Sequence, residues 1–142
     1  MQEILRNNKK IALEKLIAPE NLPHFPLKTY EEFVKFEHLA KEDPIINQFM
    51  VRRLAALGGS GIEGVTRRIM KYLMANQLGI LFNWKGRYNK IGFEKTTTMD
   101  IILEAAKLNF PANEKNDLQV AWAVKEWIKH SATRLNQNNK KR

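Results

Sequence analysis

Apolar residues recur at three- and four-residue steps through most of the chain, the spacing that places them on one side of an α-helix. The pattern predicts helices over residues 3–17, 30–41, 45–57, 60–73, 76–81, 99–108 and 116–135. The last of these has Leu118, Trp122 and Leu135 among its regularly spaced apolar positions. We therefore expect an all-α protein with little strand, a compact single-domain bundle of six or seven helices.

Residues that cap helices stand at the starts of four of these segments. Two pairs have capping-box spacing, Asp43 precedes a first-turn proline, and one threonine precedes an apolar run. These residues are Thr29 with Glu32, Ser60 with Glu63, Asp43 and Thr98. Between the first two helices, three prolines fall within residues 19–26 and predict an extended connector, because each lacks a backbone donor.

Residues 82–97, FNWKGRYNKIGFEKTT, interrupt the helical pattern with two glycines and two asparagines. This composition predicts a structured loop, of which a short hairpin is one form. Cations beside glycine can approach phosphate groups closely, and aromatic side chains can stack on bases. The loop residues with this character are Trp84, Lys85, Arg87, Tyr88 and Lys90. The alternative is that Trp84 and Phe93 fill the core while the cations are solvated.

The same patterns divide the chain into three parts. Residues 1–28 hold the N-terminal helix and proline-rich connector, 29–136 a helical domain, and 137–142 a flexible basic tail. A chain of 142 residues is long enough to bury a single core. Because the opening residues already have mid-helix character, we expect the chain to be a domain cut from a longer protein.

The net charge of +9 is distributed unevenly. Residues 1–66 contain nine Lys/Arg and nine Asp/Glu, whereas residues 67–142 contain fifteen Lys/Arg and six Asp/Glu. A one-sided positive excess attracts polyanions, chiefly nucleic acid, in a salt-dependent way. The alternative is a basic surface that only keeps the protein in solution.

Two further groups of cations lie on predicted helices. Arg67, Arg68 and Lys71 fall within about one helical turn, and three neighbouring cations repel one another unless an anion compensates. An ion pair with Glu63 or with an acid of another helix is the alternative to a bound anion.

The last predicted helix has a basic flank, formed by Lys125, Lys129 and Arg134. A helix with such a flank fits the major groove of DNA, and a solvated flank on a packing helix is the alternative. Trp122 and Trp127 are five residues apart and cannot share one stripe, so one of them is expected at an interface. We assign Trp84 and Trp127 as candidate interface residues.

Several function classes are disfavoured. The absence of cysteine excludes disulfides, thiol nucleophiles and cysteine-based metal sites, and favours an intracellular protein. His24, His38 and His130 are scattered without ligand spacing, and the glycines near residue 60 match no phosphate-binding loop. No apolar run approaches the roughly 20 residues that span a bilayer. We expect no enzyme activity, cofactor, metal, small-molecule substrate or membrane partner.

Three runs in a fixed order are distinctive: PLKTYEEFVKFEHLAKEDP, LAALGGSGIEGVTRRIMKYLM and FNWKGRYNKIGF, followed by a helix through IILEAA. Together they resemble domain-of-unknown-function family 4806, from Pro26 to about Pro111. That family occurs in animal proteins often associated with chromatin or mobile elements, which implies a nuclear, chromatin-associated protein.

A weaker likeness is to BEN domains, in the order VTRRIMKYLM, a glycine-containing basic loop, then DIILEAAKLNFP. That resemblance implies an all-helical module of transcriptional regulation that binds duplex DNA or partner proteins. The matching surface would be Arg67 and Arg68, the loop from Lys85 to Lys90, and the last helix.

We therefore expect a double-stranded DNA-binding module that acts largely through phosphate contacts. The expected contact residues are Arg67, Arg68, Lys71, Lys85, Arg87, Tyr88, Lys90, Lys125, Lys129 and Arg134. The alternative is a protein–protein or self-association domain that binds no nucleic acid, and RNA binding ranks third because no RNP-like strand motif occurs.

Overall fold

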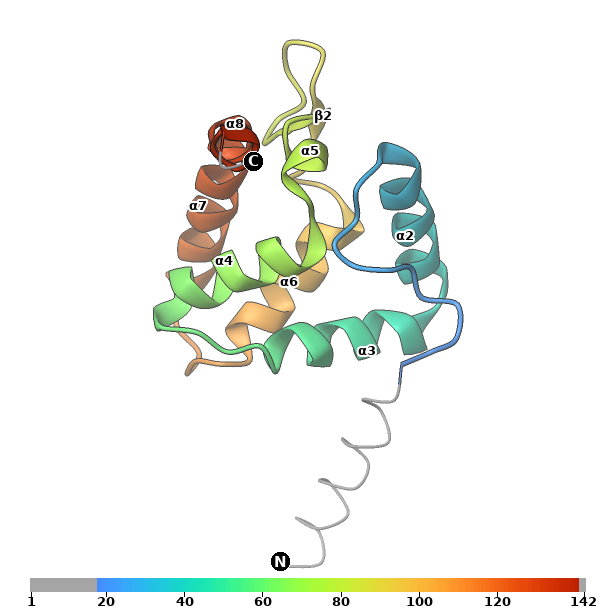
Figure 1. Cartoon of the computed structure of the whole chain (residues 1–142). Coiled ribbons are helices and arrows are strands. Elements are labelled where there is room, and N and C mark those ends of the chain that lie inside the picture. The colour runs from blue at the N-terminus through green and yellow to red at the C-terminus, as the bar shows by residue number, and fades with distance from the viewer. Residues whose placement is uncertain (1–17, 141–142) are drawn as a thin grey trace, which may run out of the picture.

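The computed structural model describes residues 18–140, and within them it contains seven helices and one pair of very short strands (Figure 1). The helices are α2 (Tyr30–Glu42), α3 (Pro44–Ala55), α4 (Gly61–Leu73), α5 (Asn76–Gly79), α6 (Thr97–Lys107), α7 (Asn116–Lys129) and α8 (Ser131–Lys140). The strands are β1 (Phe82–Asn83) and β2 (Ile91–Gly92). The expected all-α class is confirmed. The helix predicted over residues 3–17 lies outside the described residues.

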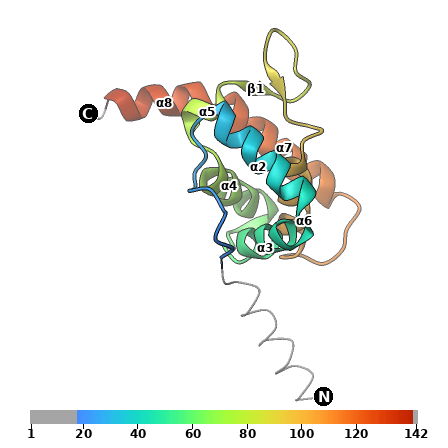
Figure 2. The ribbon, with the colours of Figure 1, turned by 90° about the vertical axis from the view of Figure 1, so that its right-hand side faces the viewer.

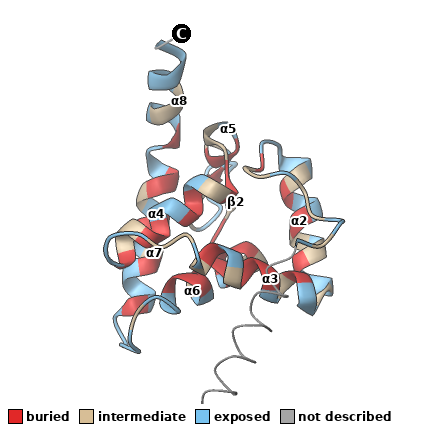
Figure 3. Cartoon of the chain, turned by 60° about the horizontal axis from the view of Figure 1, so that its bottom comes forward, coloured by how far each residue is buried: buried red, intermediate tan, exposed pale blue. Residues whose placement is uncertain are grey.

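Helices α4 and α6 occupy the middle of the bundle. Helix α4 packs against α6 and α7, α6 also contacts α2 and α3, and the short α5 lies against α8 (Figure 1). The inward faces of these helices are buried, whereas most of α8 is exposed (Figure 3). The largest fully buried side chains include Phe36, Phe93, Met50, Leu54, Ile69, Met70, Leu73 and Ile101. One apolar core therefore supports the loop between α5 and α6 as well as the helices.

The proline-rich connector is attached to the bundle by its backbone. Leu27 N–H donates to the Leu73 carbonyl at 2.7 Å, and Ala75 N–H donates to the Leu27 carbonyl at 2.9 Å. The Phe25 ring stacks on Tyr72 with 5.3 Å between centroids. These contacts join the connector to the junction of α4 and α5.

The predicted caps have mixed outcomes. Thr29 Oγ1 accepts from Glu32 N–H at 3.1 Å, and Asp43 Oδ1 accepts from Ile45 N–H at 2.9 Å, as expected. Ser60 is the N-cap residue of α4, as expected, but its side chain does not make the hydrogen bond of the predicted capping box. Glycines at both sides of Ser60 adopt positive φ, so the backbone itself makes the turn into α4.

Helix α6 begins earlier than the pattern predicts. Its N-cap is Thr96, whose Oγ1 accepts from Met99 N–H at 3.0 Å, and not Thr98. Thr98 is fully buried, and its hydroxyl donates to a Glu37 carboxylate oxygen at 2.6 Å. Glu37 also accepts from Thr97 N–H at 3.1 Å and from Thr98 N–H at 2.7 Å. A carboxylate of α2 thus satisfies the first backbone donors of α6, where the helix dipole favours negative charge.

The segment predicted as one helix over 116–135 is two helices with a break at His130, where φ is −96° and ψ is 8°. Helix α8 continues to Lys140, into the residues predicted as a flexible tail. Two leucines at apolar positions of the predicted helices are exposed, Leu108 by 62% and Leu118 by 73%. The apolar stripe of α7 runs instead through Val120, Val124, Trp127 and Ile128.

Replacing Glu37 with Gln should lower the free energy of unfolding by about 2 kcal/mol, because hydrogen bonds to a charged acceptor are lost at a helix N-terminus. Urea denaturation of the purified chain measures the change. Glu42→Gln, at an exposed position of the same helix, is the matched control and should change stability by less than about 0.5 kcal/mol. Equal effects of the two substitutions would contradict the role given to Glu37.

Candidate nucleic-acid interface

The loop between α5 and α6 projects from the bundle and is anchored by aromatic residues at its base (Figure 1). Phe82 packs edge-on against Phe33 at 4.9 Å and against Phe93 at 5.5 Å between centroids. The two strands pair in parallel, Phe82 with Ile91 and Asn83 with Gly92, rather than as an antiparallel hairpin. Phe93 is therefore a core residue. This agrees with the alternative in which aromatic residues of the loop fill the core.

Asn83 braces the loop from inside. Its Oδ1 accepts from Gly86 N–H at 2.6 Å and from Arg87 N–H at 3.1 Å, while its Nδ2 donates to the Arg87 carbonyl at 2.8 Å. Gly86 has a φ of +80°, and a Cβ there would lie 3.0 Å from Gly92 N. The strand pairing and these bonds hold the loop in one shape.

The tip of the loop is a turn with two consecutive left-handed residues. Tyr88 has a φ of 58° and Asn89 a φ of 62°, and Lys90 N–H donates to the Arg87 carbonyl at 3.1 Å. These are features of a type I′ turn. Left-handed geometry costs roughly 1–2 kcal/mol for a residue such as tyrosine, and Tyr88 is 91% exposed. The strain is therefore not offset by burial of the ring, and strain of this kind is a reason to suspect a functional position.

The loop cations differ in whether they already have a hydrogen-bond or ion-pair partner within the protein. Lys85 Nζ lies 2.7 Å from Glu94 Oε1, and this hydrogen bond is the main cause that holds the pKa of Glu94 below its usual value. Lys90 Nζ donates to the Ile80 carbonyl. Arg87 is exposed and takes part in no ion pair of residues 18–140. Of the three, Arg87 is the most available to a ligand.

Lys125 connects α7 to the loop. Its Nζ lies 5.1 Å from the centroid of the Trp84 ring, a cation–π arrangement. Trp84 is half-buried and packs against the core, so it braces the loop as well as facing Lys125. Lys129, one turn further along α7, is exposed.

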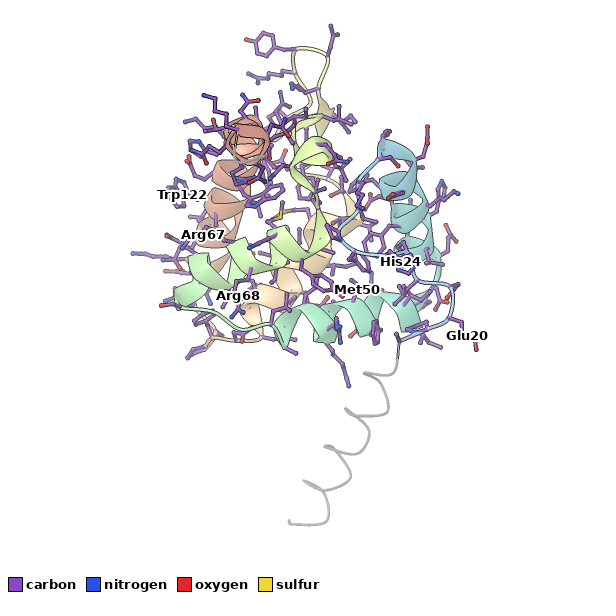
Figure 4. All side chains as sticks on the ribbon, in the orientation of Figure 1. Glu20, His24, Met50, Arg67, Arg68 and Trp122 are labelled. Carbon is purple, nitrogen blue, oxygen red and sulfur yellow. The ribbon has the colours of Figure 1, made fainter. Side chains whose placement is uncertain are left out.

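Arg67, Arg68 and Lys71 are all exposed on α4, from which Arg67 and Arg68 project in Figure 4. Their neighbours Val65, Thr66 and Ile69 face the core. The expected alternative, an ion pair with Glu63, does not occur among the ion pairs of the described residues. These three cations are therefore left without an anion in the described part of the chain, at some cost from mutual repulsion.

Arg134 uses its polar atoms inside the protein. Its Nε donates to Asn76 Oδ1 at 2.9 Å, and its Nη2 donates to the Trp127 carbonyl at 2.6 Å and to Ser131 Oγ at 3.0 Å. The guanidinium lies over the Trp127 ring, 4.2 Å from its centroid, and burial lowers the pKa of Arg134. The residue fastens α8 to α5 and to the end of α7.

The expectation that Trp127 is exposed at an interface is corrected. Trp127 is only 7% exposed because it packs beneath Arg134, whereas Trp122 is 50% exposed on the outer side of α7. One tryptophan of this pair is at the surface, as expected, and it is Trp122.

Eight of the ten predicted contact residues thus fall into two groups, and Lys129 and Arg134 belong to neither. The first, the loop patch, comprises Lys85, Arg87, Tyr88, Lys90 and, through Trp84, Lys125. The second, the α4 patch, comprises Arg67, Arg68 and Lys71. Lys71 and Arg134 line one groove between α4 and α8. Figure 1 shows the loop at the top of the bundle, whereas α4, which carries the second patch, crosses its middle.

Residues 20–105 match the model of a protein family described as a domain of unknown function, DUF4806. The chain belongs to the DUF4806 family. No curated protein and no solved structure matches it. The DUF4806 match includes the whole loop patch except Lys125, together with the α4 patch, and it ends within α6 before α7 and α8.

Within the described part of this DUF4806 chain, no helix is long and apolar enough to cross a membrane. Among the same residues, no three His, Asp or Glu side chains are grouped so that they could hold a metal ion. Sequence analysis missed the bracing role of Asn83, although an asparagine three residues before a glycine is a signal for a side-chain-stabilised turn. It also missed the exposure of Leu118 and Trp122, which depends on how α7 packs.

The pKa of Glu94 should be visibly lowered in the DUF4806 domain. Its ion pair with Lys85 contributes stability above the ordinary value of 4.5, and this contribution is lost as the pH falls through the depressed pKa of the folded state. A carbon-13 NMR titration of the Glu94 carboxyl should give a midpoint below 4.5. Lys85→Ala should raise that midpoint, and Lys95→Ala should raise it less. A midpoint unchanged by Lys85→Ala would refute the ion pair.

Proposed function

We propose that this DUF4806 domain binds double-stranded DNA, largely through phosphate contacts, as a nuclear module associated with chromatin or transcription. The observation that carries the proposal is the state of its exposed cations. Arg67, Arg68, Lys71, Arg87 and Lys129 are exposed and take part in no ion pair among residues 18–140. Cations without an anionic partner release counterions when they meet phosphates, which is the main source of non-specific affinity for DNA.

The two patches have different roles in this proposal. The α4 patch and Lys129 neutralise phosphates along one strand. The loop patch is narrow and preformed, with Arg87 next to an exposed Tyr88 at its tip. A braced loop of this shape suits a DNA groove, where arginine is attracted by the strongly negative potential. Lys85 and Lys90 contribute less, because each already has a partner in the protein.

Arg87→Ala should weaken binding to random-sequence duplex by several-fold and lower the slope of log affinity against log salt by about one, since one phosphate contact is lost. Fluorescence anisotropy at two or more salt concentrations measures both quantities. Lys35→Ala is the matched control, because it removes an exposed cation of α2 that belongs to neither patch, and should change neither quantity.

Two results would contradict the proposal. One is a wild-type affinity for duplex that does not depend on salt or cannot be detected at 50 mM salt. The other is an equal loss on Arg87→Ala and Lys35→Ala, because affinity would then follow total charge and not the loop.

A second candidate function, self-association without nucleic-acid binding, is supported by α7. Leu118 and Trp122 are four residues apart on one helix face and are 73% and 50% exposed. Exposed apolar pairs of this size often mark contact surfaces. Sedimentation equilibrium should then show a dimer in the wild type that Trp122→Ala weakens by about tenfold or more, while Gln119→Ala leaves it unchanged. A wild-type chain that stays monomeric at high micromolar concentration would rule this candidate out.

A further inference from the structure

Helix α8 lies against α5 and projects from the bundle (Figure 2). A groove of about 690 Å³ is lined by residues of α8, of α5 and of the end of α4. Apolar side chains and side-chain amides line it, and no carboxylate of residues 18–140 does. The lining residues are Pro26, Lys71, Met74, Ala75, Asn76, Gln77, Trp127, Arg134, Leu135, Gln137, Asn138 and Asn139. The volume lies within the range of small-molecule sites in proteins.

The planar guanidinium group of Arg134, called the plate below, is held in one orientation in this groove. Hydrogen bonds from Nε and Nη2 hold the guanidinium in place, and the Trp127 ring covers one of its faces at 4.2 Å. Arg134 nevertheless remains partly exposed and lines the groove. The opposite face is therefore the surface that a planar ligand would meet. Proteins use guanidinium planes of this kind to stack unpaired nucleobases.

The amides around the plate supply both donors and acceptors. Asn138 follows Arg134 by four residues, so it lies on the same side of α8, with Gln137 and Asn139 at the edges of that side. Gln77 faces them from α5. Asparagine and glutamine pair with base edges, which present donors and acceptors side by side. Lys71 is the other cation of the groove besides Arg134 and is free to meet a phosphate.

We propose that this groove binds one unpaired nucleotide, with its base stacked on Arg134, its base edge on the amides of Asn138 and Gln77, and its phosphate beside Lys71. An anionic or planar ligand of another kind would leave either the amides or the plate unused. The groove shares Lys71 with the α4 patch, but its contacts with the base come from residues outside both patches. The nucleotide can come from a single-stranded end of a nucleic acid or from free nucleotide, since both present the same base and phosphate.

The test compares a duplex carrying a two-nucleotide single-stranded end with a blunt duplex of equal phosphate number, by fluorescence anisotropy on the full chain. The wild type should bind the overhanging duplex about tenfold more tightly, the effect expected of one or two stacked bases. Gln77→Ala/Asn138→Ala should remove most of this preference and leave blunt-duplex affinity unchanged. Asn136→Ala is the matched control, because Asn136 is exposed on α8 and does not line the groove.

Adenosine monophosphate is the probe for the second source of the nucleotide, free nucleotide in solution. Its competition with the overhang at millimolar concentration would show that the groove accepts free nucleotides, and failure to compete while the preference persists would restrict the site to strand ends. No overhang preference together with no binding of adenosine monophosphate would overturn the proposal. The proposal would also be overturned if the Gln77→Ala/Asn138→Ala variant and the Asn136→Ala variant kept the same preference for the overhanging duplex as the wild type. Loss of blunt-duplex binding alone would refute duplex recognition without touching the groove.

Discussion

The carboxylate of Glu37 is the interaction that fixes where the chain leaves the loop and enters the bundle again. It reaches from α2 to the first turn of α6 and accepts hydrogen bonds from two backbone amides and the buried Thr98 hydroxyl. These amides would otherwise be left partly buried without acceptors, at a cost of about 1–3 kcal/mol for each group. Because α6 follows the loop directly, its start determines where the chain leaves the loop. A single side chain thus joins α2 to the start of α6 and so fixes the end of the loop between α5 and α6.

The helical content could be predicted from the sequence because burial of one helix face imposes a short, regular spacing of apolar residues. The ends of the helices were less predictable. Three consecutive threonines, Thr96 to Thr98, stand at the start of α6, and only packing decides that Thr96 caps the helix while Thr98 turns inward to Glu37. The break at His130 has no proline or glycine to signal it. It becomes understandable only with Ser131 buried and Arg134 bound to α5.

The candidate site shows what charge counting can and cannot establish. The excess of cations after residue 66 is a property of the sequence, and the exposure of Arg67, Arg68 and Lys71 follows from the apolar stripe of α4. The use made of each cation depends on neighbours distant in the chain. Arg134 is bound to Asn76, 58 positions away, and Lys125 faces Trp84 from another element. Spacing alone could not separate these internal roles from surface roles.

Helix α8 is attached to the protein through its first turn. Ser131 is fully buried, Gly79 has no room for a side chain beside Ser131 and Trp127, and Arg134 completes the attachment. Each of the residues 136–140 is exposed. Such a segment is a small cooperative unit that can open without global unfolding, and its amide hydrogens report that opening by fast exchange. Because one wall of the groove is α8 itself, occupancy of the groove and retention of the helix are thermodynamically linked.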